Sequence, residues 1–92
     1  MMYPEFIVIG PGKSGTTWLY NVLNIHPDVC MSSAKETMFF SDYYQKGFDW
    51  YLSFFSHCYA QKIKGEVTNT YIFSSEAPPR MYQFNSQLKL IT

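Results

Sequence analysis

Four side chains able to bind an anion stand in a glycine-rich stretch near the N-terminus, where residues 10–19 read GPGKSGTTWL. They are the ammonium group of Lys13 and the hydroxyl groups of Ser14, Thr16 and Thr17. When such a stretch joins a buried strand to a helix, its backbone N–H groups and the positive end of the helix dipole point at one spot. Together these groups predict a binding site for an anion such as phosphate.

A candidate base is Glu36, which follows Lys35 at the start of the stretch KETMFF. A carboxylate beside this apolar run is expected to be partly desolvated, which makes it a stronger base. The residues alone favour another interpretation, in which Lys35 and Glu36 form a solvated pair at the surface.

The anion-binding stretch lies between a predicted strand and a predicted helix. The apolar run FIVIG (residues 6–10) is rich in β-branched residues and typical of a short strand buried on both faces. The segment TTWLYNVLNI (residues 16–25) predicts a helix, which ends before Pro27. Its expected apolar stripe consists of Trp18, Leu19, Val22 and Leu23.

Further strands and helices are predicted along the rest of the chain. In chain order they are an extended segment over 29–31, a loop with Glu36, a helix over 50–59 capped by Asp49, a strand around 65–68, a helix from Pro78 and a strand from Leu88. Strands that alternate with helices indicate a doubly wound α/β fold with a parallel sheet. Such a sheet usually has more strands, so we expect residues 1–92 to be the N-terminal part of one larger domain.

The composition excludes several classes of protein. The 92 residues are 47% hydrophobic and 20% aromatic, enough for a packed core in one small domain. Seven basic and seven acidic residues cancel, which argues against a nucleic-acid-binding surface. Cys30 and Cys58 belong to no metal-binding motif, and we expect buried free thiols rather than a disulfide. The N-terminal apolar run is too short for a signal peptide or a membrane segment, so we expect a cytoplasmic protein.

Two familiar nucleotide-binding loops fit the glycine-rich stretch only in part. The Walker A pattern has its lysine directly after the second glycine; Gly10 and Gly15 have the right spacing, but Thr16 stands in the lysine position. The dinucleotide pattern G-x-G-x-x-G is matched when Gly12 is included, but the acidic residue expected about twenty positions later is missing. This pattern also leaves Lys13 without a role.

The stretch PGKSGTTWL resembles the 5′-phosphosulfate loop of the sulfotransferases, which follows a buried strand and has the form K-x-G-T-x-x-L. Other segments resemble the glycosaminoglycan-type members of that family in the same order along the chain: NIHPDV, KETMFF, GFDWYLSFF, GEVTNTY and PPRMYQFNSQLKLI. The resemblance extends from Phe6 to Thr92, nearly the whole chain.

The resemblance implies a three-layer α/β fold of the P-loop type, of which these residues hold a part. It implies transfer of a sulfuryl group from 3′-phosphoadenosine 5′-phosphosulfate to a hydroxyl or amine acceptor, a small molecule or a carbohydrate, without a metal ion. Lys13 and Glu36 would then be catalytic, with Glu36 as the general base. The residues that correspond to donor contacts are Gly12, Lys13, Ser14, Gly15, Thr16, Thr17 and Trp18.

The sequence departs from the family pattern at two positions. Val67 stands where the family often has a lysine and Asn69 where it has a proline, which suggests an acceptor unlike heparan chains. The family's 3′-phosphate motif would follow Thr92, so we expect the 92 residues alone to bind the donor weakly and to be inactive. Arg80 is expected on a helix surface. Two alternatives stay open: a non-catalytic anion-binding remnant, and a P-loop kinase or NTPase with an atypical loop.

Overall fold

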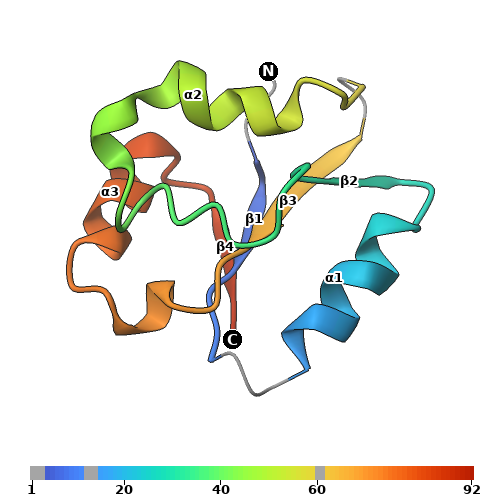
Figure 1. Cartoon of the computed structure of the whole chain (residues 1–92), viewed down its shortest axis with the longest axis horizontal. Helices are drawn as coiled ribbons and strands as arrows, with labels where there is room; N and C mark the ends of the chain where they lie inside the picture. Colours follow the sequence, from blue (N-terminus) through green and yellow to red (C-terminus); the bar gives the residue numbers. More distant parts are fainter. Residues whose placement is uncertain (1–3, 12–14, 60–61) are drawn as a thin grey trace.

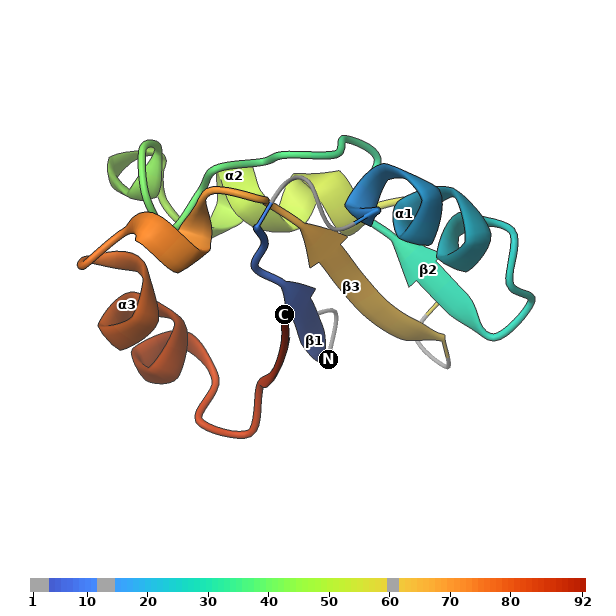
Figure 2. The ribbon, with the colours of Figure 1, turned by 90° about the horizontal axis from the view of Figure 1, so that it is seen from below.

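The structure, a computed structural model, describes residues 4–11, 15–59 and 62–92. Within these residues, four strands form one parallel sheet in the order β2-β3-β1-β4. The strands are β1 (Phe6–Val8), β2 (Val29–Met31), β3 (Ile63–Val67) and β4 (Lys89–Ile91). Figure 2 shows β2, β3 and β1 side by side in this order. The parallel sheet predicted from the sequence is confirmed.

Helices pack against both faces of the sheet. They are α1 (Thr16–Asn24), α2 (Phe48–Leu52) and α3 (Ala77–Phe84), with 3₁₀ turns at Tyr44–Lys46, Ser53–Phe55 and Tyr71–Phe73. In Figure 1, α1 lies on one side of the strands and α3 lies on the other. No helix of the described residues is long and apolar enough to cross a lipid bilayer.

Two apolar clusters fill the space between the sheet and its helices. Ile7 belongs to the larger cluster and Val8 to the smaller one, because successive residues of a strand face opposite sides of the sheet. Leu19 and Leu23 of α1 pack on the smaller cluster. The other buried members of the larger cluster come from α2, α3 and the connecting segments: Phe39, Phe40, Tyr51, Phe55, Cys58, Tyr71, Ala77 and Met81.

Helix α1 is rotated relative to the predicted apolar stripe. Leu19 and Leu23 face the sheet as predicted, but Trp18 is 69% exposed and Val22 is 39% exposed. Tyr20 packs on the sheet beside the two leucines, and its hydroxyl donates a 2.7 Å hydrogen bond to the segment after β2. The face of α1 that contacts the sheet is therefore narrower than the hydrophobic pattern suggests.

The helix predicted over residues 50–59 is shorter than expected, and Asp49 is not its cap. Helix α2 follows Gly47, whose φ of 90° lies in the left-handed region, and Asp49 lies inside the first turn. After Leu52 the chain tightens into a 3₁₀ turn. Tyr51 and Phe55 both reach the larger cluster from this segment, so its aromatic side chains are buried although the regular helix ends at Leu52.

The two cysteines form a disulfide, so the prediction of free thiols is wrong. Cys30 lies in β2, and Cys58 follows the 3₁₀ turn at Ser53–Phe55. The fold brings their Cα atoms to 5.8 Å, a separation that a disulfide spans. The pairing depends on how the segment between β2 and β3 folds back over the sheet, which the spacing of the cysteines does not reveal.

Candidate functional site

The segments that carry the predicted site residues all follow the carboxyl ends of parallel strands. The glycine-rich stretch follows β1, the loop with Glu36 follows β2, and Thr68 and Asn69 follow β3. Ligands of open α/β sheets bind at this edge. The fold therefore brings the predicted anion site and the predicted base to the same edge of the sheet.

The turn into α1 is the described part of the anion site. Gly15 precedes the helix with a φ of 77°, and a Cβ atom added there would meet open space. The N–H group of Leu19 donates to the carbonyl oxygen of Gly15 at 3.0 Å. The N–H groups of Thr16, Thr17 and Trp18 come before this bond, where a helix offers no carbonyl partner. With the positive end of the helix dipole, they suit an anion.

Three of the predicted donor contacts, Gly12, Lys13 and Ser14, lie outside the described residues, and their roles stay predictions. Thr17 is exposed at the start of α1, as is the indole of Trp18. Both side chains are therefore accessible to a ligand at this edge of the sheet.

Gly10 joins the anion site to the residues around the predicted base. Its φ of 113° is one that other residues rarely adopt. A Cβ atom added to Gly10 would also overlap the carbonyl oxygen of Asn69. The segments after β1 and β3 are therefore in backbone contact, which only glycine permits at this position. As a result, the glycine-rich stretch begins beside Asn69.

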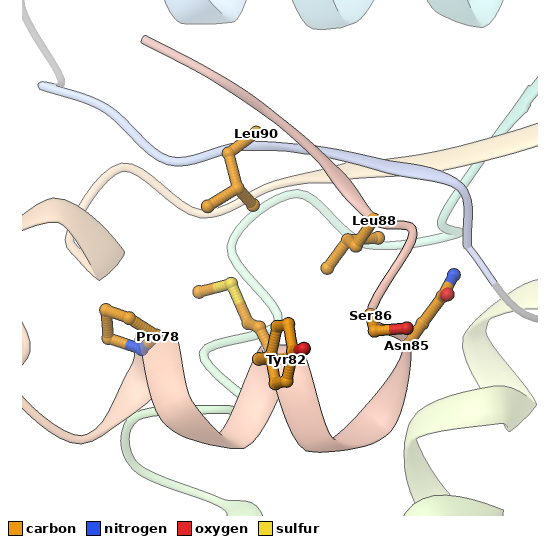
Figure 3. A pocket seen from close by; sticks show the side chains of 7 residues that line it. Pro78, Tyr82, Asn85, Ser86, Leu88 and Leu90 are labelled. Atoms are coloured by element: carbon orange, nitrogen blue, oxygen red, sulfur yellow. The ribbon is translucent and has the colours of Figure 1, made fainter.

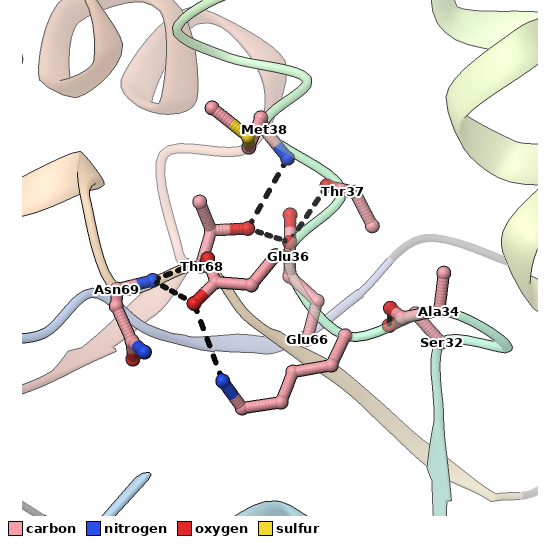
Figure 4. A network of polar contacts seen from close by, with 9 residues as sticks. Ser32, Ala34, Glu36, Thr37, Met38, Glu66, Thr68 and Asn69 are labelled. Carbon is pink, nitrogen blue, oxygen red and sulfur yellow. Dashed lines mark hydrogen bonds and ion pairs between the residues drawn. The ribbon is translucent and has the colours of Figure 1, made fainter. Parts of the chain in front are cut away.

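Glu36 is held at this edge by the backbone of Asn69 (Figure 4). The Asn69 N–H group donates to both carboxylate oxygens, at 2.8 and 3.0 Å. Lys35 donates to one of them, Oε1, at 3.3 Å. The side chains of Lys35 and Glu36 are 22% and 30% exposed, so this pair is half-buried rather than solvated. The carboxylate is fixed in place and still accessible.

The backbone around Glu36 adopts unfavourable conformations. Glu36 has a φ of 65° and Met38 a φ of 56°, and such values cost a residue other than glycine on the order of 1–3 kcal/mol each. They persist only where surrounding contacts hold them, and they gather at functional sites. One such contact is the 2.7 Å hydrogen bond from the N–H group of Glu36 to the carbonyl oxygen of Val67.

A buried carboxylate, Glu66, lies behind this loop and is not among the predicted site residues. Glu66 lies in β3 and is fully buried. It accepts hydrogen bonds from four hydroxyls, those of Thr37 (2.8 Å), Tyr51 (2.5 Å), Thr68 (2.7 Å) and Tyr71 (3.2 Å). The available signal was a glutamate inside the strand predicted around residues 65–68, because a carboxylate buried in a parallel sheet needs hydrogen-bond partners.

The ionisable groups of this network influence one another. Burial raises the pKa of Glu66, and the hydrogen bonds that it accepts, that of Tyr51 first, offset part of this shift. Burial also raises the pKa of Tyr51 and of Tyr71, and the nearby Glu66 carboxylate raises both further. Both phenols therefore keep their protons over the physiological range and remain hydrogen-bond donors.

The two departures from the family pattern have different consequences. Val67 is fully buried in the smaller cluster, beneath α1, so its side chain is closed to a ligand. Asn69 supplies the N–H group that binds Glu36, and a proline there would have none. The Oδ1 atom of Asn69 is buried without a hydrogen-bond partner among the described residues.

Arg80 lies on the surface of α3, as expected, with its side chain 28% exposed, and it also contacts a neighbouring segment. Its guanidinium donates to the carbonyl oxygens of Phe40 and Ser41, at 3.0 and 3.3 Å. It also lies 4.6 Å from the ring centroid of Tyr44 and 3.4 Å from the carboxylate of Glu76. Arg80 thus ties α3 to the end of the loop that carries Glu36.

A hollow of about 290 Å³ opens next to this loop. Its lining combines hydroxyl, carboxylate and apolar groups, from Met38, Ser41, Asp42, Thr70, Phe73, Ser74 and Glu76. Since Thr70 directly follows Asn69, this hollow is the candidate acceptor pocket. A smaller one of about 190 Å³ lies between α3 and β4, and it contains none of the predicted site residues (Figure 3).

One group of described residues has the composition of a metal site. Cys30 Sγ, Cys58 Sγ and a ring nitrogen of His57 lie within 4.8 Å of one another. The two sulfur atoms are bonded to each other, whereas a metal ion would need them as thiolates. The imidazole Nε2 lies 3.0 Å from the carbonyl oxygen of Met31. The group is therefore a disulfide with a neighbouring histidine.

Comparison with known proteins identifies the family. Residues 4–88 match the model of the sulfotransferase family, so the chain belongs to this family. A sulfotransferase from Alicyclobacillus acidocaldarius has the same fold, with a TM-score of 0.85 at 26% identity; the match covers 96% of this chain and 42% of that one. The resemblance to sulfotransferases and the α/β fold that it implied are confirmed.

Individual relatives share about two fifths of their residues with this chain in the matched region. The chain is 41% identical over 91 residues to the membrane-associated sulfotransferase kil1 of Dictyostelium discoideum. It is 38% identical over 89 residues to the heparan sulfate glucosamine 3-O-sulfotransferase 5 of Homo sapiens, and 36% identical over 103 residues to the bifunctional heparan sulfate N-deacetylase/N-sulfotransferase 3 of Homo sapiens. These matches cover 96–97% of this chain but only 19%, 26% and 11% of the relatives.

Proposed function

We propose that the protein carrying these 92 residues transfers a sulfuryl group from 3′-phosphoadenosine 5′-phosphosulfate to a hydroxyl or amine group of a carbohydrate. One observation carries the proposal: Asn69 fixes both carboxylate oxygens of Glu36 at the sheet edge where Gly15 leads into α1. Transfer of a charged group to a hydroxyl needs an anion site and a base in one place. Two of the relatives carry heparan sulfate in their names, which supports a carbohydrate acceptor.

The start of α1 fits the 5′-phosphosulfate end of the donor, because Gly15 leaves open space before a row of N–H groups. When bound, the donor supplies the sulfuryl group and a phosphate as its leaving group. The N–H groups of Thr16 and Thr17 would bind the phosphate oxygens. Lys13 would neutralise the negative charge that the leaving oxygen gains. A sulfuryl group carries less charge than a phosphoryl group, so the proposal includes no metal ion.

Glu36 would take the proton that the acceptor hydroxyl loses when its oxygen attacks sulfur. Lys35 donates to Oε1, while Oε2 accepts only from Asn69 among the residues that the structure describes. Oε2 therefore has the more accessible lone pair and is the atom that would take the proton. The acceptor would lie in the hollow next to Met38 and Thr70. A positioned base of this kind contributes about 10²–10⁴-fold to the rate.

Transfer from radiolabelled donor to heparan sulfate and to N-desulfated heparan sulfate tests the proposal. We expect Glu36→Gln to lower kcat about 10²–10⁴-fold without changing the affinity for adenosine 3′,5′-bisphosphate. Lys13→Ala should lower both kcat and this affinity. Asp28→Asn is the matched control, because it neutralises an exposed carboxylate in the turn before β2. This variant should keep the kcat of the unmodified protein.

Other results would favour the alternatives. Magnesium-dependent phosphoryl transfer from ATP would establish a P-loop kinase or NTPase instead. Failure to bind either ATP or adenosine 3′,5′-bisphosphate would leave a non-catalytic remnant. The same binding measurement on residues 1–92 alone tests whether they form the N-terminal part of a domain whose 3′-phosphate motif follows Thr92. In that case we expect weak binding.

A further inference from the structure

Three successive N–H groups of the loop after Glu36 donate to three hydroxyls that share one acceptor. The pairs are Met38 with Thr68 Oγ1 (3.3 Å), Phe39 with Thr37 Oγ1 (3.4 Å) and Phe40 with the phenol of Tyr71 (3.2 Å). Each of these hydroxyls in turn donates to Glu66. One layer of hydroxyls therefore connects the whole turn after the proposed base to a single buried carboxylate, as Figure 4 shows for the two threonines.

These hydrogen bonds hold both segments that contact Glu36. On one side, Thr37 directly follows Glu36 and its unfavourable φ of 65°; Thr37 is 3% exposed and donates to Glu66. On the other side, Thr68 donates to Glu66 and precedes Asn69, whose N–H group binds the Glu36 carboxylate. Glu66 thus anchors the loop of the base and the strand end that orients its side chain.

We propose that Glu66 is the positioning residue for Glu36: through the layer of hydroxyls it fixes the turn that aims the Glu36 carboxylate at the acceptor. This inference rests on the proposed function, in which Glu36 is the base. Glu66 is fully buried, so its side chain is closed to the donor and to the acceptor. Its effect on catalysis is therefore exerted through the orientation of Glu36.

A carboxylate suits this role for a stated chemical reason. It offers about four acceptor sites and no donor, which matches the four hydroxyls around Glu66. Each hydroxyl can then accept from the loop and donate to Glu66 at the same time. A glutamine would turn an NH₂ group toward two of the hydroxyls, which would lose their acceptor. A buried network of this kind is rigid when every member is satisfied.

Two tyrosines that both contact Glu66 allow an effect on the position of Glu36 to be distinguished from an effect on stability. Tyr51 and Tyr71 both donate to Oε2 of Glu66, but only Tyr71 also accepts the N–H group of Phe40. With heparan sulfate as the acceptor probe, we expect Tyr71→Phe to lower kcat about tenfold with KM for the donor unchanged, because a misplacement of about 1 Å can cost about 100-fold. Tyr51→Phe removes a hydrogen bond to Glu66 but leaves the Phe40 N–H group bonded, so it should cost less kcat for a given loss of stability.

Amide hydrogen exchange supplies a readout that needs no acceptor. Loss of the Tyr71 hydroxyl should speed the exchange of the Phe40 amide more than loss of the Tyr51 hydroxyl does. If the two variants change exchange and kcat alike, in proportion to their loss of stability, the network only stabilises the fold and the inference is overturned.

A double-mutant cycle tests whether Glu66 acts through Glu36. Glu66→Gln should lower kcat about tenfold or more in the otherwise unmodified protein, and not further in Glu36→Gln. An equal loss in both backgrounds would overturn the inference and leave the proposed function intact. If the unmodified protein transfers no sulfuryl group, the proposed function is what fails. Tyr71→Phe replaces Glu66→Gln in the cycle if the latter does not fold.

Discussion

At the turn from Gly15 into α1, the candidate site offers backbone N–H groups at an exposed helix start. At Glu36 it offers one carboxylate backed by a buried network, in which Thr37 is 3% exposed and Glu66 is not exposed at all. We refer to these regions as the donor side and the base side. The donor side is formed by one continuous stretch of chain. The base side needs residues from β3, α2 and the segments after β2 and β3.

This difference agrees with the roles proposed for the two sides. The charge of a phosphate is spread over several oxygens, and N–H groups at a helix start satisfy it without further support. A base must be presented in one orientation, to within about 0.5 Å, and such precision requires packed side chains around it. The base side is therefore expected to be the more sensitive of the two to changes at a distance.

Substitution by alanine at Gly10 and at Gly15 should give the largest difference in the free energy of unfolding. At Gly10, where the two sides meet, a Cβ atom would overlap the Asn69 carbonyl and the φ is 113°; we expect the free energy of unfolding to fall by about 4 kcal/mol. At Gly15 the added Cβ meets open space, and only the φ of 77° opposes it, so we expect a fall of about 1 kcal/mol. Urea denaturation followed by tryptophan fluorescence measures both. Equal losses would show that the close contact at Gly10 is not decisive.

Removal of the disulfide should have the next largest effect on stability. We expect this effect on the base side. The bond connects β2, which leads into the loop of Glu36, to the segment after Ser53–Phe55. We expect the double variant Cys30→Ser, Cys58→Ser to lose about 3 kcal/mol of stability in urea denaturation. Affinity for adenosine 3′,5′-bisphosphate should change little, because both cysteines contact the larger cluster, on the other face of the sheet from α1. A large loss of affinity would contradict the separation of the two sides.

The same bond bears on the predicted cytoplasmic location, which stays a prediction. Disulfides persist in oxidising compartments and are rare in the cytosol. Alkylation of the protein in its own cells, followed by mass spectrometry, reports the state of Cys30 and Cys58. Two alkylated thiols would support the cytoplasmic prediction, whereas two protected cysteines would contradict it.

The sequence predicted the fold well because the relevant signals are local. A short apolar run marks β1, and prolines mark the end of α1 and the start of α3. The anion site was equally local, since glycines, a lysine and the first turn of α1 adjoin one another in the chain. Glu36 became a candidate base only through the resemblance to sulfotransferases, because its own neighbours favoured a solvated pair.

The rest of the site could not be predicted because it depends on contacts between distant segments. Two of the hydroxyls around Glu66, those of Thr37 and Tyr51, come from positions 29 and 15 residues away in the chain. Arg80 reaches carbonyl oxygens about 40 residues earlier. A periodic sequence pattern cannot show which distant side chains form hydrogen bonds with each other. For the same reason it could not show that Cys30 pairs with Cys58.

Substitution of Asn69 gives the last test of the comparison, because its expected effect is on kcat, through the base side, rather than on stability. Asn69→Pro removes the N–H group that binds both oxygens of Glu36. A hydrogen bond to a charged group is worth about 1.5–3 kcal/mol, so we expect kcat to fall about 10- to 100-fold with donor affinity unchanged. Transfer to heparan sulfate and binding of adenosine 3′,5′-bisphosphate measure the two quantities.

The control for this variant is Asn69→Ala, which keeps the N–H group and removes an amide whose Oδ1 has no partner among the described residues. We expect this variant to keep most of its activity. If alanine were as harmful as proline, the side chain rather than the backbone would orient the base. If proline were harmless, Glu36 would be held by the network around Glu66 alone. A low kcat for Asn69→Pro and a nearly unchanged kcat for Asn69→Ala would explain why this position, a proline in the family pattern, is occupied here by a residue with a backbone N–H group.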